Sequence, residues 1–255
     1  MSSHNSRILD QFTRQAAPFA AAAAIRNQEA LNRIVQWAGT TREDTVLDVA
    51  CGPGLLACAF AHVAKHITGI DMTPAMLEQA RRAQQEQGLE NISWEQGDVY
   101  SLPFRPDHFS IVSSRFVFHH LENPIAALKE MQRVCKPGGK VVVADMVPQP
   151  AKAAALNAAE LLRDPSHVRA LPLDLLRGLF EQASLVAPQV NNYRMEGELE
   201  DLLSRSFPNE GDADRLRRIY ADSIDDNALD LNTRLVDGKI FYSMPVAVLV
   251  AQKSD

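Results

Sequence analysis

The chain has 255 residues, of which 46% are hydrophobic, and a formal net charge of −6 at pH 7. This length and apolar content are enough to bury a core as one domain, residues 1–255. No dense Lys/Arg run occurs, which argues against a nucleic-acid partner. Three scattered cysteines fit a reducing cytoplasm. The apolar run Ala20–Ala24 is too short to span a bilayer, so we expect a cytoplasmic protein without an integral membrane segment. A homodimer is left open.

The first 44 residues predict helices that precede the core. Ile8–Ala24 is rich in alanine and predicts one or two short helices interrupted near Pro18. Asn27–Ala38 predicts a further helix with an apolar face. Such helices can cover the edge of a sheet or form a lid over a ligand, and their residue pattern leaves both interpretations open.

The stretch from Thr45 to Asp71 predicts a strand, a glycine turn, a helix and a second strand. Thr45–Val49 is a short β-branched run, and the glycines that follow cannot continue it. Because glycine has no Cβ, the turn lets the backbone approach a ligand closely. His66–Ile70 predicts the second strand, and the carboxylate of Asp71 at its end can bind ribose hydroxyls. This layout is typical of a nucleotide-binding unit.

The glycine turn leaves two classes of ligand to compare. Gly52 to Ala57 fits the pattern G-x-G-x-x-A, so NAD or FAD must be considered. However, Asp48 just before the turn would repel a pyrophosphate, and Pro53 removes an N–H that could bind one. S-adenosylmethionine (SAM) carries an ammonium, a sulfonium and a ribose but no phosphate, and therefore fits these residues better.

The rest of the chain continues to alternate between strands and helices. The expected helices are 74–87, 124–134, 151–163 and 173–183, and the expected strands are 92–96, 109–113, 140–145, 186–193 and 240–251. This order predicts an α/β fold with a doubly wound, mostly parallel sheet. Residues 149–172 are too long for a simple crossover and predict a helical cap, between a core at 45–148 and C-terminal strands and helices at 173–255. Pro245 places the last strand near an edge or a bulge.

Asp48–Gly54 resembles the first motif of class I SAM-dependent methyltransferases, and in particular the UbiE-like small-molecule enzymes. Four later motifs extend the resemblance in the same order: Gly69-Ile70-Asp71, Gly97-Asp98-Val99, Leu102-Pro103-Phe104 and Lys136-Pro137-Gly138-Gly139. The resemblance implies a seven-stranded Rossmann-like sheet whose last strand inserts antiparallel between strands 5 and 6. It also favours the lid interpretation of the N-terminal helices, with Phe19 as a substrate contact.

The same resemblance implies which residues bind the cofactor. Asp98 would bond the adenine amino group, the backbone of Val99 would meet the ring, and Asp71 would bind the ribose. The full set of predicted cofactor-binding residues is Asp48, Ala50, Gly52, Gly54, Asp71, Met72, Asp98, Val99 and Arg115. Arg115 could instead bind an acidic substrate, pair with a carboxylate, or be a solvated strand end.

His119 and His120 follow the fourth strand, where ligands bind in open α/β sheets. An imidazole there could take a proton from the methyl acceptor, and His119 is the candidate catalytic base, with His120 as a substrate contact. The alternative is structural: one ring caps a turn and the other packs on the sheet. His167 and Arg169 on the cap are candidate substrate contacts, or else only stabilise the turn after Asp164.

Two other features are considered, a possible metal site and a possible reactive cysteine. Cys58, His62 and His66 recur every four residues, but His66 begins a strand, so no metal site is expected. Cys51 has no evident base beside it and is interpreted as a packed side chain.

The prediction is therefore an enzyme that moves a methyl group from SAM to an oxygen, carbon or nitrogen of a small phenolic, quinone-like or natural-product acceptor. Three alternatives remain: an NAD-dependent oxidoreductase, an enzyme that retains SAM without transferring its methyl group, and a non-catalytic SAM-binding subunit.

Overall fold

The computed structural model describes residues 3–185 and 187–254. Its helices are α1 (Ser3–Ala21), α2 (Gln28–Trp37), α3 (Leu55–Ala61), α4 (Pro74–Glu86), α5 (Pro124–Val134), α6 (Ala153–Arg163), α7 (Leu173–Gln182), α8 (Leu199–Ser204) and α9 (Asp212–Asp226), with a 3₁₀ turn η1 at Phe118–His120. Its strands are β1 (Thr45–Val49), β2 (His66–Asp71), β3 (Ile92–Gln96), β4 (Phe109–Arg115), β5 (Cys135–Met146), β6 (Gln189–Glu198), β7 (Arg234–Val236) and β8 (Lys239–Gln252).

The strands form a sheet in the order β3-β2-β1-β4-β5-β8-β6, and β7 pairs with β8 off this path. The first five strands of the path are mutually parallel. Strand β8 runs antiparallel to both β5 and β6. The predicted doubly wound α/β fold is confirmed, including the insertion of the last strand between strands 5 and 6. The short β7 adds an eighth strand that the sequence did not predict.

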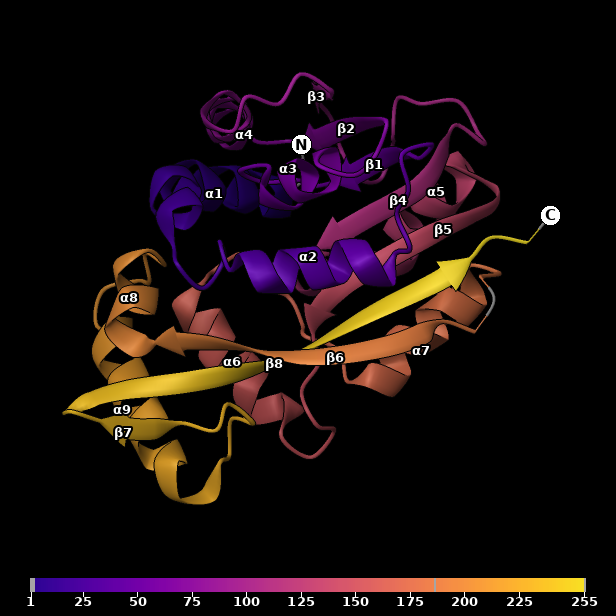
Figure 1. Cartoon of the computed structure of the whole chain (residues 1–255). Coiled ribbons are helices and arrows are strands. Elements are labelled where there is room, and N and C mark those ends of the chain that lie inside the picture. Colours follow the sequence, from indigo (N-terminus) through magenta and orange to yellow (C-terminus); the bar gives the residue numbers. More distant parts are fainter. Residues whose placement is uncertain (1–2, 186, 255) are drawn as a thin grey trace.

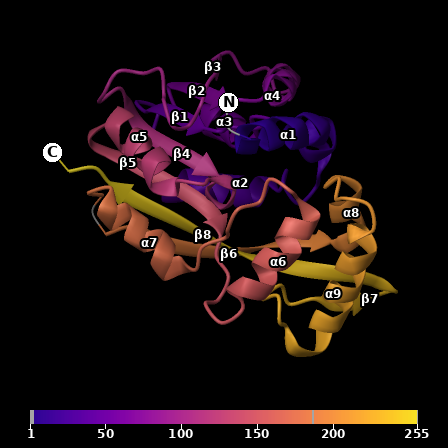
Figure 2. The same ribbon diagram turned by 180° about the vertical axis from the view of Figure 1, so that it is seen from behind.

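Helices cover both faces of this sheet (Figures 1 and 2). One core cluster joins alternate strand residues such as Val46 and Ile111 to α2 and α3, and continues to α6, α8 and α9. The other joins the intervening residues, such as Leu47 and Val112, to α5 and α7. Because side chains alternate along a strand, this division is what a sheet buried on both faces requires.

The N-terminal helix differs from the prediction. A single helix runs from Ser3 to Ala21 with Pro18 inside it, instead of short helices broken near that residue. Proline removes one i→i−4 hydrogen bond, and a position in the last turn limits the loss because few bonds lie beyond it. The helix α2 is as expected, with the Asn27 side chain accepting a hydrogen bond from the Ala30 N–H at 3.0 Å.

The C-terminal part also shows why Pro245 is tolerated inside a long strand. The register of β8 with β5 ends at the pair Met146–Val246, so Pro245 lies one residue beyond the partnered segment on that side. This position satisfies the rule that proline avoids fully paired strand positions. The strand β6 was expected at 186–193, but it spans Gln189–Glu198, and Val186 lies outside the described residues.

Within residues 3–185 and 187–254, no helix combines the length and apolar character needed to cross a membrane.

Candidate active site

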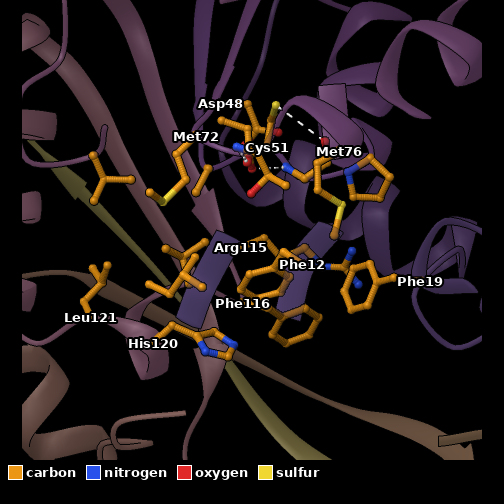
Figure 3. Close-up of a pocket in the computed structure, with 18 of the residues that line it drawn as sticks. Phe12, Phe19, Asp48, Cys51, Met72, Met76, Arg115, Phe116, His120 and Leu121 are labelled. Carbon is orange, nitrogen blue, oxygen red and sulfur yellow. Dashed lines mark hydrogen bonds between the residues drawn. The ribbon is translucent and has the colours of Figure 1, made fainter. Parts of the chain in front are cut away.

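A cavity lies beyond the carboxyl ends of β1, β2, β3 and β4, with α1 across it. It holds about 1020 Å³ of empty space, open space at its mouth included. Figure 3 shows Asp48, Cys51, Met72 and Met76 along one side and aromatic side chains with His120 along the other. We call this space the cofactor cavity. Its walls therefore come from the segments after four parallel strands, where open α/β sheets bind ligands.

The glycine turn shapes one wall of the cofactor cavity. Gly52 has φ +53° and Gly54 has φ +75°, a conformation that strains other residues. Gly54 is the residue before α3, and a Cβ there would lie 2.6 Å from Trp94 and 2.8 Å from the Ala80 Cβ. A Cβ on Gly52 would meet nothing within 4 Å, although Gly52 lines the cavity. The first glycine therefore borders the ligand space, whereas the second packs the turn onto its neighbours.

Two buried carboxylates face this cavity. Asp71 accepts hydrogen bonds from the Gly52 N–H and the Thr73 N–H, both at 2.8 Å. The side chain of Asp48 accepts one from the Ser113 hydroxyl at 2.9 Å. Burial raises the pKa of Asp48 to about 7, and it also raises the pKa of Asp71. A ligand that carries positive charge would relieve this cost by favouring the ionised forms.

Arg115 lies at the end of β4 and is the cation of the cofactor cavity. Its Nη1 donates to the Ile25 carbonyl at 3.3 Å, and the guanidinium lies 4.5 Å from the centre of the Phe116 ring. Its Nε and Nη2 are buried without a hydrogen-bond partner. Buried guanidinium donors without partners are costly, so this arrangement favours an anionic ligand group beside them.

The segment after β3 supplies a further acidic group. Asp98 lines the cofactor cavity together with Val99 and Tyr100. One carboxylate oxygen, Oδ1, accepts from the Tyr100 N–H at 3.0 Å, which holds the turn. The other oxygen can serve a ligand.

The helix α1 covers the cavity, and three of its side chains form hydrogen bonds with other segments of the chain. The His4 Nε2–H donates to the His120 carbonyl at 2.8 Å. The Gln11 side chain donates to the Ser206 carbonyl at 2.5 Å, and the Gln15 side chain donates to Asp164 at 3.1 Å. These three polar side chains are buried on one stripe of α1.

A second cavity, with about 510 Å³ of empty space, open space at its mouth included, adjoins the first. The two cavities share five lining residues: Phe12, Phe19, Ile25, Phe116 and His120. We call the second space the acceptor cavity. Its other walls come from α1, η1, β5, α6, β6, α8 and β8 and the residues beside them: Gln15, His119, Met146, Arg163, Asp164, Met195, Leu202, Arg205, Tyr242 and Met244.

His119 and His120 point to different partners. The His119 Nδ1–H donates to Asp145 at 2.6 Å, and the ring lines the acceptor cavity. Burial acts against ionisation of Asp145, but His119 and the backbone N–H groups of Phe118 and Met146 hold its pKa below the usual value. His120 lines both cavities, and its Nδ1 lies 3.1 Å from the Ser166 carbonyl. Burial and the neighbouring His119 lower the pKa of His120, which keeps that ring neutral.

Most of the site residues predicted from the sequence line one of the two cavities. The cofactor cavity brings together Asp48, Ala50, Gly52, Asp71, Met72, Asp98, Val99, Arg115, Phe19 and His120. Gly54 does not line the cavity but packs against Trp94 and Ala80, and His119 lines the acceptor cavity. His167 and Arg169 line neither cavity.

His167 is buried and donates to the Asn157 side chain at 2.7 Å. Arg169 is exposed, and its backbone N–H donates to the His119 carbonyl at 3.0 Å. Their predicted contact with substrate stays a prediction.

Sequence reasoning missed much of the wall. The omitted residues include His4, Ile8, Phe12, Gln15, Met76, Tyr100, Arg205 and Tyr242. On α1 the signal was present, because residues 4, 8, 12, 15 and 19 recur at helical spacing.

The three residues weighed as metal ligands do not gather. His62 bonds Gln87 at 3.2 Å, and His66 bonds Ser93 at 3.0 Å. In the described part of the chain, no three His, Cys, Asp or Glu side chains form a metal-binding group.

Comparison with known proteins places this geometry in a family. Residues 47–143 match the family described as Methyltransferase domain. YcgJ of Bacillus subtilis, named an uncharacterized methyltransferase, is 32% identical over 179 residues, which cover 69% of this chain and 71% of the relative. The chain belongs to the class I SAM-dependent methyltransferases. The resemblance inferred from the glycine turn is thereby confirmed.

Three further comparisons with this methyltransferase differ in sequence identity and in the share of the chain that they cover. The crystal structure of YcgJ has a TM-score of 0.80 at 26% identity, covering 89% of this chain and 99% of that chain. A ubiquinone/menaquinone C-methyltransferase, UbiE of Bdellovibrio bacteriovorus, is 39% identical over 113 residues, covering 44% of this chain and 48% of that enzyme. The [4+2]-cyclase SpnF has a TM-score of 0.61 at 21% identity, covering 89% and 81% of the two chains, which shows the fold alone.

Family membership decides the question that the glycine motif left open. The enzyme is a SAM-dependent methyltransferase, and SAM, not NAD, is its cofactor.

Proposed function

We propose that this methyltransferase acts on a small, largely apolar molecule that binds in the acceptor cavity, at a carbon, oxygen or nitrogen of that molecule. The observation that carries the proposal is the shared wall of Phe12, Phe19, Phe116 and His120, because an acceptor there would lie directly beside the cofactor. Holding the reacting atoms in line in a space with little water supplies much of the catalysis that methyl transfer needs. When bound, SAM supplies a methyl group on a positively charged sulfur that leaves as a neutral thioether.

The residues of the cofactor cavity fit SAM. Two buried carboxylates with raised pKa values suit its cationic groups and ribose, and the two unpartnered nitrogens of Arg115 suit its carboxylate. We assign Asp48 to the ammonium side, Asp71 to the ribose hydroxyls, and Asp98 with Val99 to adenine. Ala50, Gly52 and Met72 would line the ligand, and Gly54 would hold the turn.

His119 remains the proposed catalytic base. Asp145 binds its Nδ1–H, which leaves Nε2 as the nitrogen that can take a proton. This arrangement supports a role in removing a proton from the acceptor as the methyl group arrives. A carbon or oxygen acceptor would need such a base more than an amine would.

Phenolic, quinone-like and natural-product acceptors are the proposed classes, and the UbiE relative favours a quinone-like one. The division into a lid at residues 1–44, a core, a cap at 149–172 and a C-terminal part stays part of this proposal. The three hydrogen bonds of α1 support the lid.

The test is methyl transfer from SAM that carries a trideuterated methyl group. Panels of phenols, hydroquinones and amines are incubated with the enzyme, and products are analysed by mass spectrometry. We expect one product class with three deuterium atoms and an equal amount of S-adenosylhomocysteine.

The same experiment tests the alternative considered from the sequence, an enzyme that retains SAM without transferring its methyl group. An acceptor converted without deuterium, with SAM recovered intact, would favour this alternative. A chain that binds SAM and converts no acceptor would favour a non-catalytic subunit.

A further inference from the structure

We propose that the acceptor is an apolar carboxylic acid whose carboxylate binds Arg205 and Tyr242 in the acceptor cavity. This inference rests on the proposed function, because it names the substrate class of the same site. Among the described residues, nine side chains carry buried polar atoms without a hydrogen-bond partner. Of these, Arg115 lines the cofactor cavity, and Arg205 and Tyr242 line the acceptor cavity.

Arg205 directly follows α8, and its side chain is only 6% exposed. Its Nε donates to Asp201 at 3.3 Å, on the side where Asp201 meets solvent. Its Nη2 has no partner. A guanidinium N–H withdrawn from water without an acceptor is destabilising, so a ligand oxygen bonded to Nη2 would recover that cost.

Tyr242 lies on β8 and is fully buried, with its hydroxyl unpartnered. Its cross-strand neighbour on β6 is Gly197, and a Cβ there would lie 2.4 Å from the phenol oxygen. The glycine therefore makes room for the tyrosine hydroxyl. Burial raises the pKa of Tyr242, so the hydroxyl stays protonated and can donate a hydrogen bond.

The charged residues around the acceptor cavity favour a ligand with a single negative charge. Arg163 is already engaged, because it bonds Glu160 at 2.7 Å and lies 3.8 Å from Asp164. Arg205, the other arginine of this wall, is paired with Asp201 through Nε, and its Nη2 stays available for a ligand. Despite burial, the charge of Arg163 and the hydrogen bonds from the Ser166 hydroxyl and N–H lower the pKa of Asp164, so an ionised carboxylate shares the cavity. That charge would repel a dianionic phosphate more than a carboxylate.

The remaining wall describes the body of the ligand. Phe12, Phe116, Met146, Met195, Leu202 and Met244 surround it with apolar atoms. Aromatic and thioether side chains suit a planar or flexible hydrocarbon. The expected ligand is therefore a monocarboxylate with an aryl or alkyl body.

The experiment uses four probes: trans-4-hydroxycinnamate, decanoate, and the methyl ester of each. Binding to the full chain is measured by calorimetry with S-adenosylhomocysteine at saturation. The variants are Arg205→Met, Tyr242→Phe, which removes one oxygen, and Arg81→Met as a control at an exposed arginine of α4. Thermal melting and S-adenosylhomocysteine affinity report whether each variant is folded.

We expect at least one acid to bind the wild-type protein tenfold or more tightly than its ester, as hydrogen bonds to a charged group imply. In Arg205→Met the acid should bind no better than the ester, and Tyr242→Phe should lose several-fold. Arg81→Met should change neither, and S-adenosylhomocysteine affinity should stay within about twofold in all variants.

Equal affinities of acid and ester, failure of both acids to bind, or an acid preference that survives Arg205→Met would each overturn the inference. If Arg205→Met does not fold, the wild-type comparison and Tyr242→Phe still decide it. Failure of the proposed function would look different: acids would bind through Arg205 while no deuterated methyl group reaches any acceptor.

Discussion

The Nδ1 atom of His119 lies 2.6 Å from the Oδ1 atom of Asp145, and both side chains are almost entirely buried. The carboxylate is itself held by the Phe118 N–H at 2.7 Å. The imidazole therefore has a fixed orientation beside the acceptor cavity.

If His119 is the catalytic base, His119→Asn should lower kcat by about 10²–10⁴-fold. SAM affinity, measured by calorimetry, should change little because this ring does not line the cofactor cavity. The control is His66→Asn, at a histidine that bonds Ser93 away from both cavities. A kcat within threefold of the wild type in His119→Asn would assign the ring a structural role.

Three glycines with positive φ, Gly54, Gly88 and Gly52, differ in what an added Cβ would contact. Gly54→Ala should lower the free energy of unfolding by about 3 kcal/mol, since it combines a strained φ with overpacking against Trp94. Gly88→Ala, with φ +63° and no close neighbour, should cost only about 1 kcal/mol. Urea unfolding measures both values. Equal losses in the two variants would contradict the packing described for Gly54.

The glycine that borders the cofactor cavity should behave differently. Gly52→Ala should match Gly88→Ala in stability, because a Cβ at either position meets no protein atom within 4 Å. Its affinity for SAM should fall tenfold or more, because the methyl group would enter the ligand space. Calorimetry on the two variants side by side measures this difference, and unchanged affinity in Gly52→Ala would place the ligand elsewhere.

The affinity for SAM should depend on pH through Asp48. Burial raises the pKa of this carboxyl from 3.8 to about 7, so below pH 7 it must lose a proton before it can attract a cation. Affinity should rise with pH by up to about tenfold per unit below pH 7 and level off above it.

The same shift has the opposite effect on the ligand-free protein. An acid whose folded pKa exceeds its unfolded value makes its largest contribution to stability at acid pH, and this is lost as the pH rises through about 7. Asp48→Asn should flatten the affinity profile. A profile that is unchanged in that variant would assign the pH dependence to another group, such as Asp71.

Removing hydrogen bonds that hold α1 should make this helix open more often. Gln11→Leu combined with Gln15→Leu removes the bonds to Ser206 and Asp164. Because each such bond contributes about 1 kcal/mol, amides of α1 should exchange with solvent roughly fivefold faster or more. The control is Gln36→Leu, at an exposed glutamine on α2. Unchanged exchange in α1 would show that its apolar contacts alone hold it down.

Much of the central fold could be predicted because its signals are local. Strands such as Thr45–Val49 and Ile92–Gln96, and the helix Pro124–Val134 with its N-terminal proline, have the predicted bounds. The carboxyl ends of parallel strands meet at one edge, so Asp48, Asp71 and Asp98 could be placed together without a structure.

The acceptor cavity could not be predicted in the same way. Gln15, Arg205 and Tyr242 come from α1, the end of α8 and β8, which only tertiary packing brings together. The break expected near Pro18 did not occur, because a proline in the last turn costs a helix little. His167 and Arg169 were chosen for their place on the cap, but neither lines a cavity, because the buried one bonds Asn157 and the other faces solvent.

The most direct test of the account is a calorimetric titration of the wild-type protein, Asp71→Ala and Glu181→Ala with SAM, with NAD as the control ligand. Asp71 lines the cofactor cavity, whereas Glu181 is exposed on α7. We predict that SAM binds, that Asp71→Ala weakens it by about 1.5–3 kcal/mol, that Glu181→Ala leaves it unchanged, and that NAD gives no heat. SAM binding that is absent, or indifferent to Asp71, would contradict the cofactor site described here.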